Sequence, residues 1–322
     1  MNGVKLSVVV VVYRMRRQAM NTLLSLSASY QQGVREEDYE VIVVENASDQ
    51  NLDPQAVSRL GGNFRYYLRE ENLPTPVFAL DEGVRRARGD QLCIMIDGAR
   101  MLTPGVLRLG MLAAHMFPFP LVAVPGYHLG RDLHQEVAGA GYDSEEEARL
   151  LESIGWPQEG YRLFEICCLS NANPGGVINP MMESNCFFFR KTTLEEAGGI
   201  DLRFDLPGGG MLNLDLYRRI GLVPGTELVV TPGEGSFHQY HGGVTTRHDR
   251  ERERLVREFQ EQYIELRGVR FQGLRRQPFL LGRVPPQAYW VLDLSSRHAL
   301  NRLEKLRRLG HDLWPDEPGS GA

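Results

Sequence analysis

The stretch from Gln91 to Pro104, QLCIMIDGARMLTP, places one carboxylate, Asp97, directly after a short apolar run. An acid at the carboxyl end of a buried strand lies where open α/β sheets bind their ligands. Position 99, where a second acid of a metal-binding pair would stand, holds alanine. A cation bound by Asp97 therefore needs a further ligand from another part of the chain.

The composition is that of an ordinary globular protein, with 42% apolar and 24% charged residues in 322. A net charge of −5 argues against a general nucleic-acid-binding protein. The four cysteines show no CxxC spacing, and Cys93 and Cys186 lie in apolar runs, which is typical of buried thiols in a reducing compartment. No apolar run approaches the roughly 18 residues of a membrane span, so we expect a cytoplasmic protein.

Stepwise alternation of strand-like and helical patterns predicts the fold class. Residues 6–12 and 39–44 are continuous apolar, β-branched runs, typical of parallel strands covered on both faces. With strands at 64–68 and 91–96 and helices at 15–30 and 77–88, they predict a doubly wound, mostly parallel α/β sheet with helices on both faces. No GxGxxG or GxxxxGK[ST] occurs, which disfavours dinucleotide-binding and P-loop proteins.

The rest of the chain is more varied. We predict strands at 121–125, 186–189 and 228–231 and helices at 103–116, 192–197 and 212–220. Between residues 127 and 173 the pattern weakens, and this length favours an excursion over the site, with a helix at 144–154 capped by Ser144. After Thr246 the sequence turns into charge-rich helices.

Five motifs, in order along residues 5–220, resemble the nucleotide-sugar-dependent glycosyltransferases of family 2, which have the GT-A fold. They are LSVVVVVYRM, VIVVENASD, the stretch ENLPTPVFALDEGVRRARGD, the strand with Asp97-Gly98-Ala99 in place of a DxD, and EEAGGIDLRF. The resemblance implies a GT-A domain over residues 1–245, with a nucleotide-binding half at about 1–125 and an acceptor half at about 126–245. Residues 246–322 are expected to form a helical extension with a disordered tail.

The resemblance also implies roles for individual residues. Tyr13, Glu45 and Asn46 are expected to hold the nucleoside of a donor, most simply a UDP-sugar. Asp97 is expected to bind the diphosphate through a divalent cation, Mn²⁺ or Mg²⁺, while Arg100 adds compensating charge. A late histidine completes the metal site in several GT-A enzymes, and the segment GEGSFHQYHGG offers two for that place, His238 and His241.

An inverting transferase needs a carboxylate that takes the proton of the acceptor hydroxyl. Where the family carries an acidic pair, this chain has Leu212-Asn213, and an amide has no proton affinity near neutrality. Asp215 and Glu183 are the remaining candidates for the base. If neither serves, a retaining mechanism, which needs no such base, is the alternative, so the sequence leaves the stereochemical outcome open.

The implied function is transfer of a sugar to a hydroxyl acceptor of a glycan or small molecule. The substitutions at positions 99 and 213 motivate an alternative, a degenerate GT-A fold that serves as a binding or scaffolding module. A nucleotidyltransferase ranks lower, because YRMRRQ has the arginines of such a loop without its glycines. The last helix has a basic face, with leucines near the opposite one, and we expect it to pack on the main domain or on a second copy of the chain. Peripheral contact of the basic face with the inner face of a membrane is the alternative.

Overall fold

The protein is built on one large and one small β-sheet, as seen in a computed structural model that describes residues 3–137, 142–241 and 250–317. The main sheet has eight strands in the order β12-β10-β6-β9-β4-β1-β2-β3. Every neighbouring pair is parallel except those of β9, which runs antiparallel to both β4 and β6. The strands are β1 Leu6–Val12, β2 Tyr39–Asn46, β3 Phe64–Arg69, β4 Gln91–Met95, β6 Phe119–Ala123, β9 Phe187–Arg190, β10 Thr226–Val230 and β12 Phe279–Leu280.

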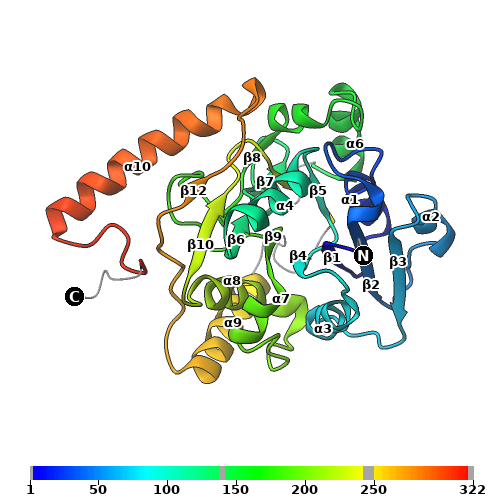
Figure 1. Ribbon diagram of the computed structural model, residues 1–322, viewed down its shortest axis with the longest axis horizontal. Helices are drawn as coiled ribbons and strands as arrows, with labels where there is room; N and C mark the ends of the chain where they lie inside the picture. Colours follow the sequence, from blue (N-terminus) through cyan, green and yellow to red (C-terminus); the bar gives the residue numbers. More distant parts are fainter. Residues whose placement is uncertain (1–2, 138–141, 242–249, 318–322) are drawn as a thin grey trace.

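Helices cover both faces of the main sheet (Figure 1), as predicted. α1, α2 and α4 lie on one face, in the hydrophobic cluster that also contains Val8 and Val10 of β1. α3, α7, α8 and α9 lie on the other face, in the cluster that contains Val9 and Val11. A strand buried on both faces needs apolar side chains at every position, which explains the run of valines. The helices are α1 Arg16–Ser25, α2 Pro54–Ser58, α3 Val77–Arg86, α4 Val106–Met116, α7 Lys191–Glu196, α8 Leu212–Gly221 and α9 Arg250–Arg267.

A second, four-stranded sheet has the order β5-β11-β7-β8, and the sequence analysis did not predict it. Its strands are β5 Arg100–Leu102, β7 Gly126–Leu129, β8 Cys167–Leu169 and β11 Ser236–His238. Each has only three or four residues, too few for a periodic pattern. The region expected to be an excursion over the site therefore contributes two strands, β7 and β8, to this sheet.

The same region contains α5 His134–Val137, α6 Ser144–Ser153 and the 3₁₀ helix Gly160–Glu165. The predicted cap of α6 is off by one residue. Asp143, not Ser144, is the N-cap, because its carboxylate accepts hydrogen bonds from the backbone N–H groups of Glu145 and Glu146. Asp143 has the extended backbone that an N-cap requires.

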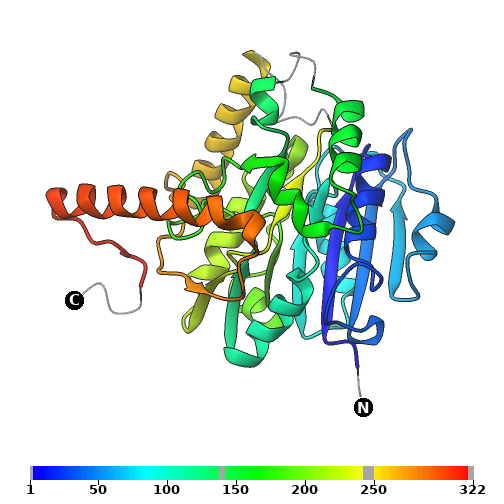
Figure 2. The same cartoon turned by 90° about the horizontal axis from the view of Figure 1, so that it is seen from above.

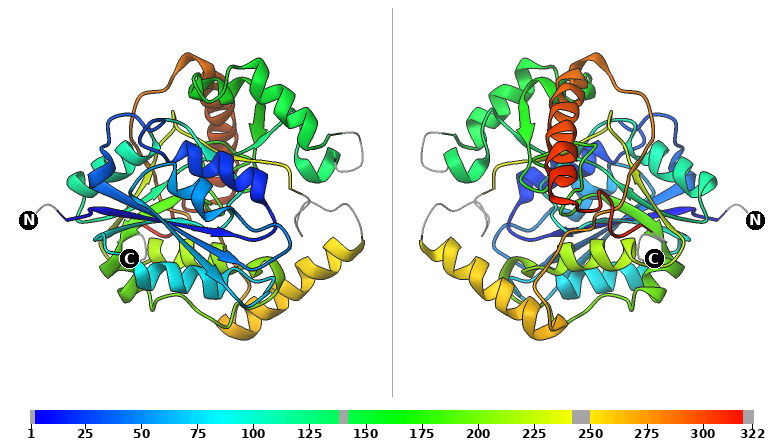
Figure 3. Two further views of the ribbon diagram at one scale, coloured as in Figure 1. Left: turned by 90° about the vertical axis from the view of Figure 1, so that its right-hand side faces the viewer. Right: turned by 90° about the vertical axis from the view of Figure 1, so that its left-hand side faces the viewer.

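The carboxyl-terminal segment is more than a helical extension, because β12 adds an edge strand to the main sheet beside β10. The last helix, α10 Tyr289–Leu309, starts on the body through buried Val291 and then projects away from it (Figure 2). Figure 3 shows α10 on the side of the molecule opposite to β3. Leu300 on its projecting part is 66% exposed.

The domain boundary expected at residue 246 and most of the expected disordered tail, residues 318–322, lie outside the described residues, and the domain assignment stays a prediction. Within the described part of the chain, no helix is long and apolar enough to cross a bilayer. The partner for α10, a second copy or a membrane surface, also remains a prediction.

Close packing of α4 on β9 gives a test of the fold. A Cβ atom at Gly110 of α4 would lie 2.5 Å from the Phe188 ring of β9. We expect Gly110→Ala to lower the free energy of unfolding by about 1–3 kcal/mol through overpacking, although alanine is the better helix former. Leu112→Ala, at an exposed position of the same helix, is the control and should change stability much less. A more stable Gly110→Ala in urea unfolding would contradict this packing.

Candidate functional site

Asp97 follows β4 at the carboxyl edge of the main sheet, where the sequence predicted a ligand site. Its Oδ1 accepts a hydrogen bond from the backbone N–H of Ala99 at 3.0 Å, which closes a tight turn between β4 and β5. Its Oδ2 lies 3.3 Å from Nε of Arg100. Ala99 is fully buried and belongs to the hydrophobic cluster that also contains Met95 and Leu102.

Pairing between β5 and β11 brings a distant part of the chain to this turn. The two strands run antiparallel, with His238 directly opposite Arg100. The backbone N–H of Gln239 continues the ladder by donating to the carbonyl of Ala99 at 2.8 Å. As a result, Nε2 of His238 lies 3.1 Å from Oδ2 of Asp97.

His241 completes a compact group with these two residues. Its Nε2 is 3.9 Å from Oδ1 of Asp97 and 3.0 Å from Nε2 of His238. Asp97, His238 and His241 each offer one ligand atom, and the three atoms lie within 4.8 Å of one another. The sequence left open which histidine approaches Asp97, and the structure brings both to it.

The electrostatics of this group suit a cation. Burial would raise the pKa of the Asp97 carboxyl, but the hydrogen bond from His238 and the permanent charge of Arg100 hold that pKa well below its usual range. Burial, with the nearby Arg100, lowers the pKa of His238 to about 3. Near neutral pH an ionised carboxylate therefore faces a neutral imidazole, the protonation states that metal binding requires.

Arg100 adds a positive group with spare hydrogen-bonding capacity. Its side chain is 8% exposed, and Nη1 is buried without a hydrogen-bond partner within the described part of the protein. A buried donor left unpaired costs free energy, so such a group is suited to an anionic ligand oxygen.

Glu183, one of the two candidate bases, lies at the same site. Its Oε2 accepts a hydrogen bond from Nδ2 of Asn213 at 2.7 Å, and that amide also donates to the carbonyl of Ser184 at 2.9 Å. Burial raises the pKa of Glu183, and the charges of Arg100 and Asp97 both act on it. The residue that replaces the family's acid, Asn213, thus holds the other candidate acid in place.

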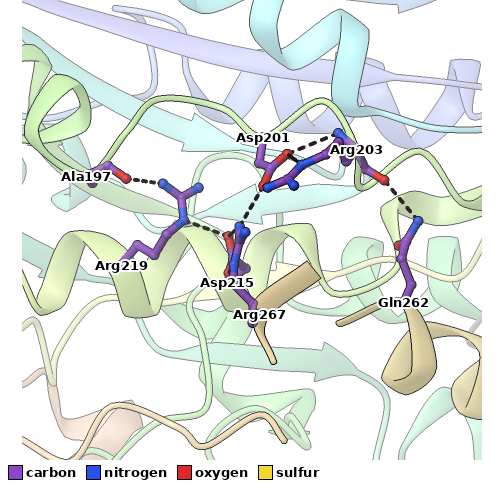
Figure 4. A network of polar contacts seen from close by, with 7 residues as sticks. All are labelled: Ala197, Asp201, Arg203, Asp215, Arg219, Gln262 and Arg267. Atoms are coloured by element: carbon purple, nitrogen blue, oxygen red, sulfur yellow. Dashed lines mark hydrogen bonds and ion pairs between the residues drawn. The ribbon is translucent and has the colours of Figure 1, made fainter. Parts of the chain in front are cut away.

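Asp215, the second candidate base, is occupied by arginines (Figure 4). Its carboxylate is 1% exposed and accepts from Nε of Arg219 at 2.7 Å and from Nε and Nη2 of Arg267 at 2.7 and 2.8 Å. Arg267, on α9, also pairs with Asp201 at 2.9 Å. Two guanidinium groups compete with any hydroxyl proton for this carboxylate, which argues against Asp215 as the base and gives it the role of fastening α9 to α8.

Tyr13 lies at the carboxyl end of β1, on the same edge of the sheet as Asp97. Its hydroxyl donates to Oδ1 of Asn72 at 2.9 Å, in an exposed contact. The next residue, Arg14, has a positive φ of 55° and pairs with Asp49 at 3.2 Å, so the chain turns sharply here. Tyr13 is therefore available to a ligand at this edge.

Glu45 and Asn46, also predicted to hold the nucleoside, point inward instead. Oε2 of Glu45 accepts from the backbone N–H of Leu52 at 2.9 Å and from the Tyr66 hydroxyl at 2.7 Å, and the side chain is fully buried. Nδ2 of Asn46 donates to the carbonyls of Leu73 and Thr75, both at 2.9 Å. Because these bonds fix the loops that follow β2 and β3, both residues position the edge of the site rather than face a ligand.

Two histidines that the sequence reasoning missed lie beside this site. His128 of β7 is directly opposite His238 in the parallel β7–β11 pair, and the ring of His134 is 5.2 Å from that of His238. Burial lowers the pKa of His128, and it lowers the pKa of His134 to about 4. Their only signal in the sequence is that both stand in one short segment of a region without periodic pattern.

Comparison with known proteins gives a match to one protein family. Residues 7–111 match the model of a family described as Glycosyl transferase family 2. Over this stretch the chain is similar to glycosyltransferase family 2. The predicted family and the predicted class of enzyme, a glycosyltransferase, are therefore confirmed. No curated protein matches the chain.

Several solved structures are similar to this chain. A mannosyltransferase, PcManGT from Pyrobaculum calidifontis, in complex with GDP-Man and Mn²⁺, is 16% identical, with a TM-score of 0.50 over 93% of this chain and 75% of that one. TarS from S. aureus, residues 1–349, is 12% identical, with a TM-score of 0.45 over 82% of this chain and 72% of that one. The first likeness bears out the predicted GT-A fold.

The arginine network around Asp215 gives a stability test. Arg267→Ala removes one of two partners from a buried carboxylate, and we expect a loss of about 3 kcal/mol, the lower end for broken buried pairs, because Arg219 remains. Arg203→Ala is the matched control from the same network, since the Arg203 side chain is 63% exposed. An exposed pair contributes at most about 1 kcal/mol. Equal losses for the two variants in urea unfolding would show that Asp215 does not depend on Arg267.

Proposed function

We propose that this protein transfers a sugar from a nucleotide diphosphate donor to a hydroxyl acceptor of a glycan or small molecule. The observation that carries the proposal is the group at the end of β4, where an ionised carboxylate, two imidazoles and an unpaired arginine nitrogen meet. A departing nucleoside diphosphate builds up negative charge, and this is a place where such charge is balanced.

The donor set of Asp97, His238 and His241 fits a divalent cation. One carboxylate oxygen with imidazole nitrogens suits Mn²⁺ better than Mg²⁺, which prefers oxygen ligands alone. When bound, such a cation supplies charge stabilisation to the diphosphate. The mannosyltransferase with GDP-Man and Mn²⁺ makes Mn²⁺ the first ion to test.

Arg100 compensates in part for the absent second acid, because it supplies positive charge to the diphosphate directly. A second acid would strengthen binding of the metal ion, whereas Arg100 is itself a cation that stays protonated near neutral pH. Its unpaired Nη1 would donate to a phosphate oxygen. We therefore propose lower dependence on the metal than in an enzyme with two acids.

The nucleoside would lie along the edge formed by the ends of β1 and β2. Tyr13 would contact the base, while Glu45 and Asn46 keep the loops around it in place through their inward hydrogen bonds. A UDP-sugar is the first donor to test and a GDP-sugar the second, since GDP-Man is bound by the similar mannosyltransferase.

Glu183 is our proposed base. The acceptor oxygen attacks the anomeric carbon, the bond from that carbon to the diphosphate oxygen breaks, and the hydroxyl proton passes to Glu183. Asn213 donates to Oε2 of this carboxylate and Asn185 also hydrogen-bonds to it, and we assign the acceptor proton to Oε1. This assignment implies inversion at the anomeric carbon.

The alternative, a scaffold with no catalysis, is favoured by the alanine at position 99 and the amide at position 213. Slow hydrolysis of the donor separates the two functions, because a transferase without acceptor still releases nucleoside diphosphate. A panel of UDP- and GDP-sugars with Mn²⁺ should give measurable release, and a scaffold should give none.

Substitution of Asp97 tests the metal site. A ligand that binds only the native state raises its thermal stability, so Mn²⁺ should increase the shift produced by the right nucleotide. We expect Asp97→Asn to abolish the Mn²⁺-dependent part of that shift while the fold stays intact. Asp81→Asn, which removes a carboxylate paired with Arg85 on α3, is the control. A Mn²⁺-dependent shift that survives in Asp97→Asn would exclude Asp97 from the site.

Substitution of Glu183 and Asn213 tests the base. We expect Glu183→Gln to lower the transfer rate by about 10²–10⁴-fold and to keep donor affinity, because a general base contributes that much. The wild-type rate should rise with pH through the raised pKa of Glu183, above the roughly 4.3 of an ordinary glutamate.

Asn213 tests the same base from its partner's side. Its hydrogen bond lowers the pKa of Glu183, so Asn213→Ala should move the acidic limb of the pH profile to higher pH. An unmoved limb, or full activity in Glu183→Gln, would remove Glu183 from the mechanism.

A further inference from the structure

Three buried imidazoles from three secondary-structure elements lie close together beside the Asp97 site. His128 comes from β7, His134 from α5 and His238 from β11, and they are 8%, 0% and 4% exposed. The ring of His128 lies 4.6 Å from that of His134 and 5.0 Å from that of His238. His128 and His134 have no part in the proposed transfer reaction.

The three rings lie close enough together to hold one ion through one nitrogen each. Each ring offers one nitrogen, and the three nitrogens lie within 4.8 Å of one another. The Nδ1 atoms of all three are buried and have no hydrogen-bond partner within the described residues. Three buried polar atoms without hydrogen bonds lower the stability of the fold unless a ligand binds them.

The outer nitrogens show which atoms carry lone pairs. Nε2 of His134 donates to the carbonyl of Leu129 at 2.9 Å, because a carbonyl oxygen only accepts. The neutral ring therefore has its lone pair on Nδ1. Nε2 of His238 lies 3.1 Å from the Asp97 carboxylate, which favours the same tautomer. Imidazoles held from behind by a carbonyl and a carboxylate are the usual outer arrangement of metal-binding histidines.

We propose that His128, His134 and His238 bind a divalent transition metal of the zinc class through their Nδ1 atoms, at a second site that shares His238 with the one at Asp97. Three neutral nitrogens without a carboxylate select Zn²⁺, Co²⁺, Ni²⁺ or Cu²⁺ over Mg²⁺ and Ca²⁺. A zinc–nitrogen bond of about 2.0–2.1 Å needs nitrogens about 3.4 Å apart in a tetrahedral site, so small movements of the rings suffice.

The surroundings of the cluster shield the ion and link the two sites. Tyr142 stacks on His134 with ring centroids 5.6 Å apart, and Tyr240 meets the same ring edge-on at 5.7 Å. A neutral imidazole has one lone pair, so His238 bound to zinc through Nδ1 keeps its proton on Nε2 for Asp97. In that state His241 is the imidazole left to join Asp97 in binding a second cation.

The test uses the full chain stripped of metal with a chelator, then mixed with Zn²⁺ alone and separated from free ion. We expect about one tightly held zinc per chain by elemental analysis and titration calorimetry. His134→Ala should weaken zinc binding by more than the about 10–100-fold that loss of an outer-shell partner costs. His241→Ala, a histidine of the Asp97 group only, and His115→Ala, a histidine on α4, are the controls and should retain the ion.

Co²⁺ gives a second readout that does not depend on one variant. In the wild type it should produce the strong visible absorption of a tetrahedral site, and His128→Ala should lose it while circular dichroism shows an intact fold. A wild type that holds no zinc, zinc that remains in His134→Ala, or equal loss in His241→Ala would each overturn the proposal. The last result would place the ion between Asp97 and His241 instead.

Discussion

Antiparallel pairing of β5 with β11 is the contact on which the site depends. It sets His238 opposite Arg100 and ties the backbone after β11 to the turn at Ala99. Without this ladder Asp97 would end β4 alone, as one exposed acid with a single arginine beside it. β11 also pairs with β7, which places His238 opposite His128. One three-residue strand thus joins both groups of histidines.

The balance of charge follows from this pairing. The alanine at position 99 removes an acid, and the ladder brings the neutral imidazole of His238 to Asp97, which also pairs with Arg100. Affinity for a cation must then come from ligand type more than from total charge. A similar replacement is found on the acceptor side. Asn213 stands where the family has an acid and donates to Glu183, and Asp215 is paired with arginines. Both departures from the family pattern, Ala99 and Asn213, are thus accompanied by other polar residues at the same place in the structure.

The sequence predicted the centre of the main sheet well, because β1, β2 and β4 are mostly apolar and buried at every position. It placed β1 at its observed bounds and β2 within two residues at its carboxyl end. The small sheet escaped prediction, since its strands are short and mixed in polarity and are held by pairing between segments far apart in the chain. For that reason Asp97, His238 and His241 were predicted as metal ligands from their residue types and motifs, whereas His128 and His134 were missed. Glu45 and Asn46 were located at the right strand end, but only coordinates reveal that their side chains turn inward.

The central claim is that the end of β4 balances the charge of a departing nucleoside diphosphate. The most direct measurement is anomalous X-ray scattering from crystals grown with Mn²⁺ and a nucleoside diphosphate that binds. The account predicts a manganese peak at coordination distance from Asp97 and from at least one of His238 and His241, with Arg100 on a phosphate oxygen. A nucleotide bound elsewhere, or a manganese ion without Asp97 among its ligands, would contradict it.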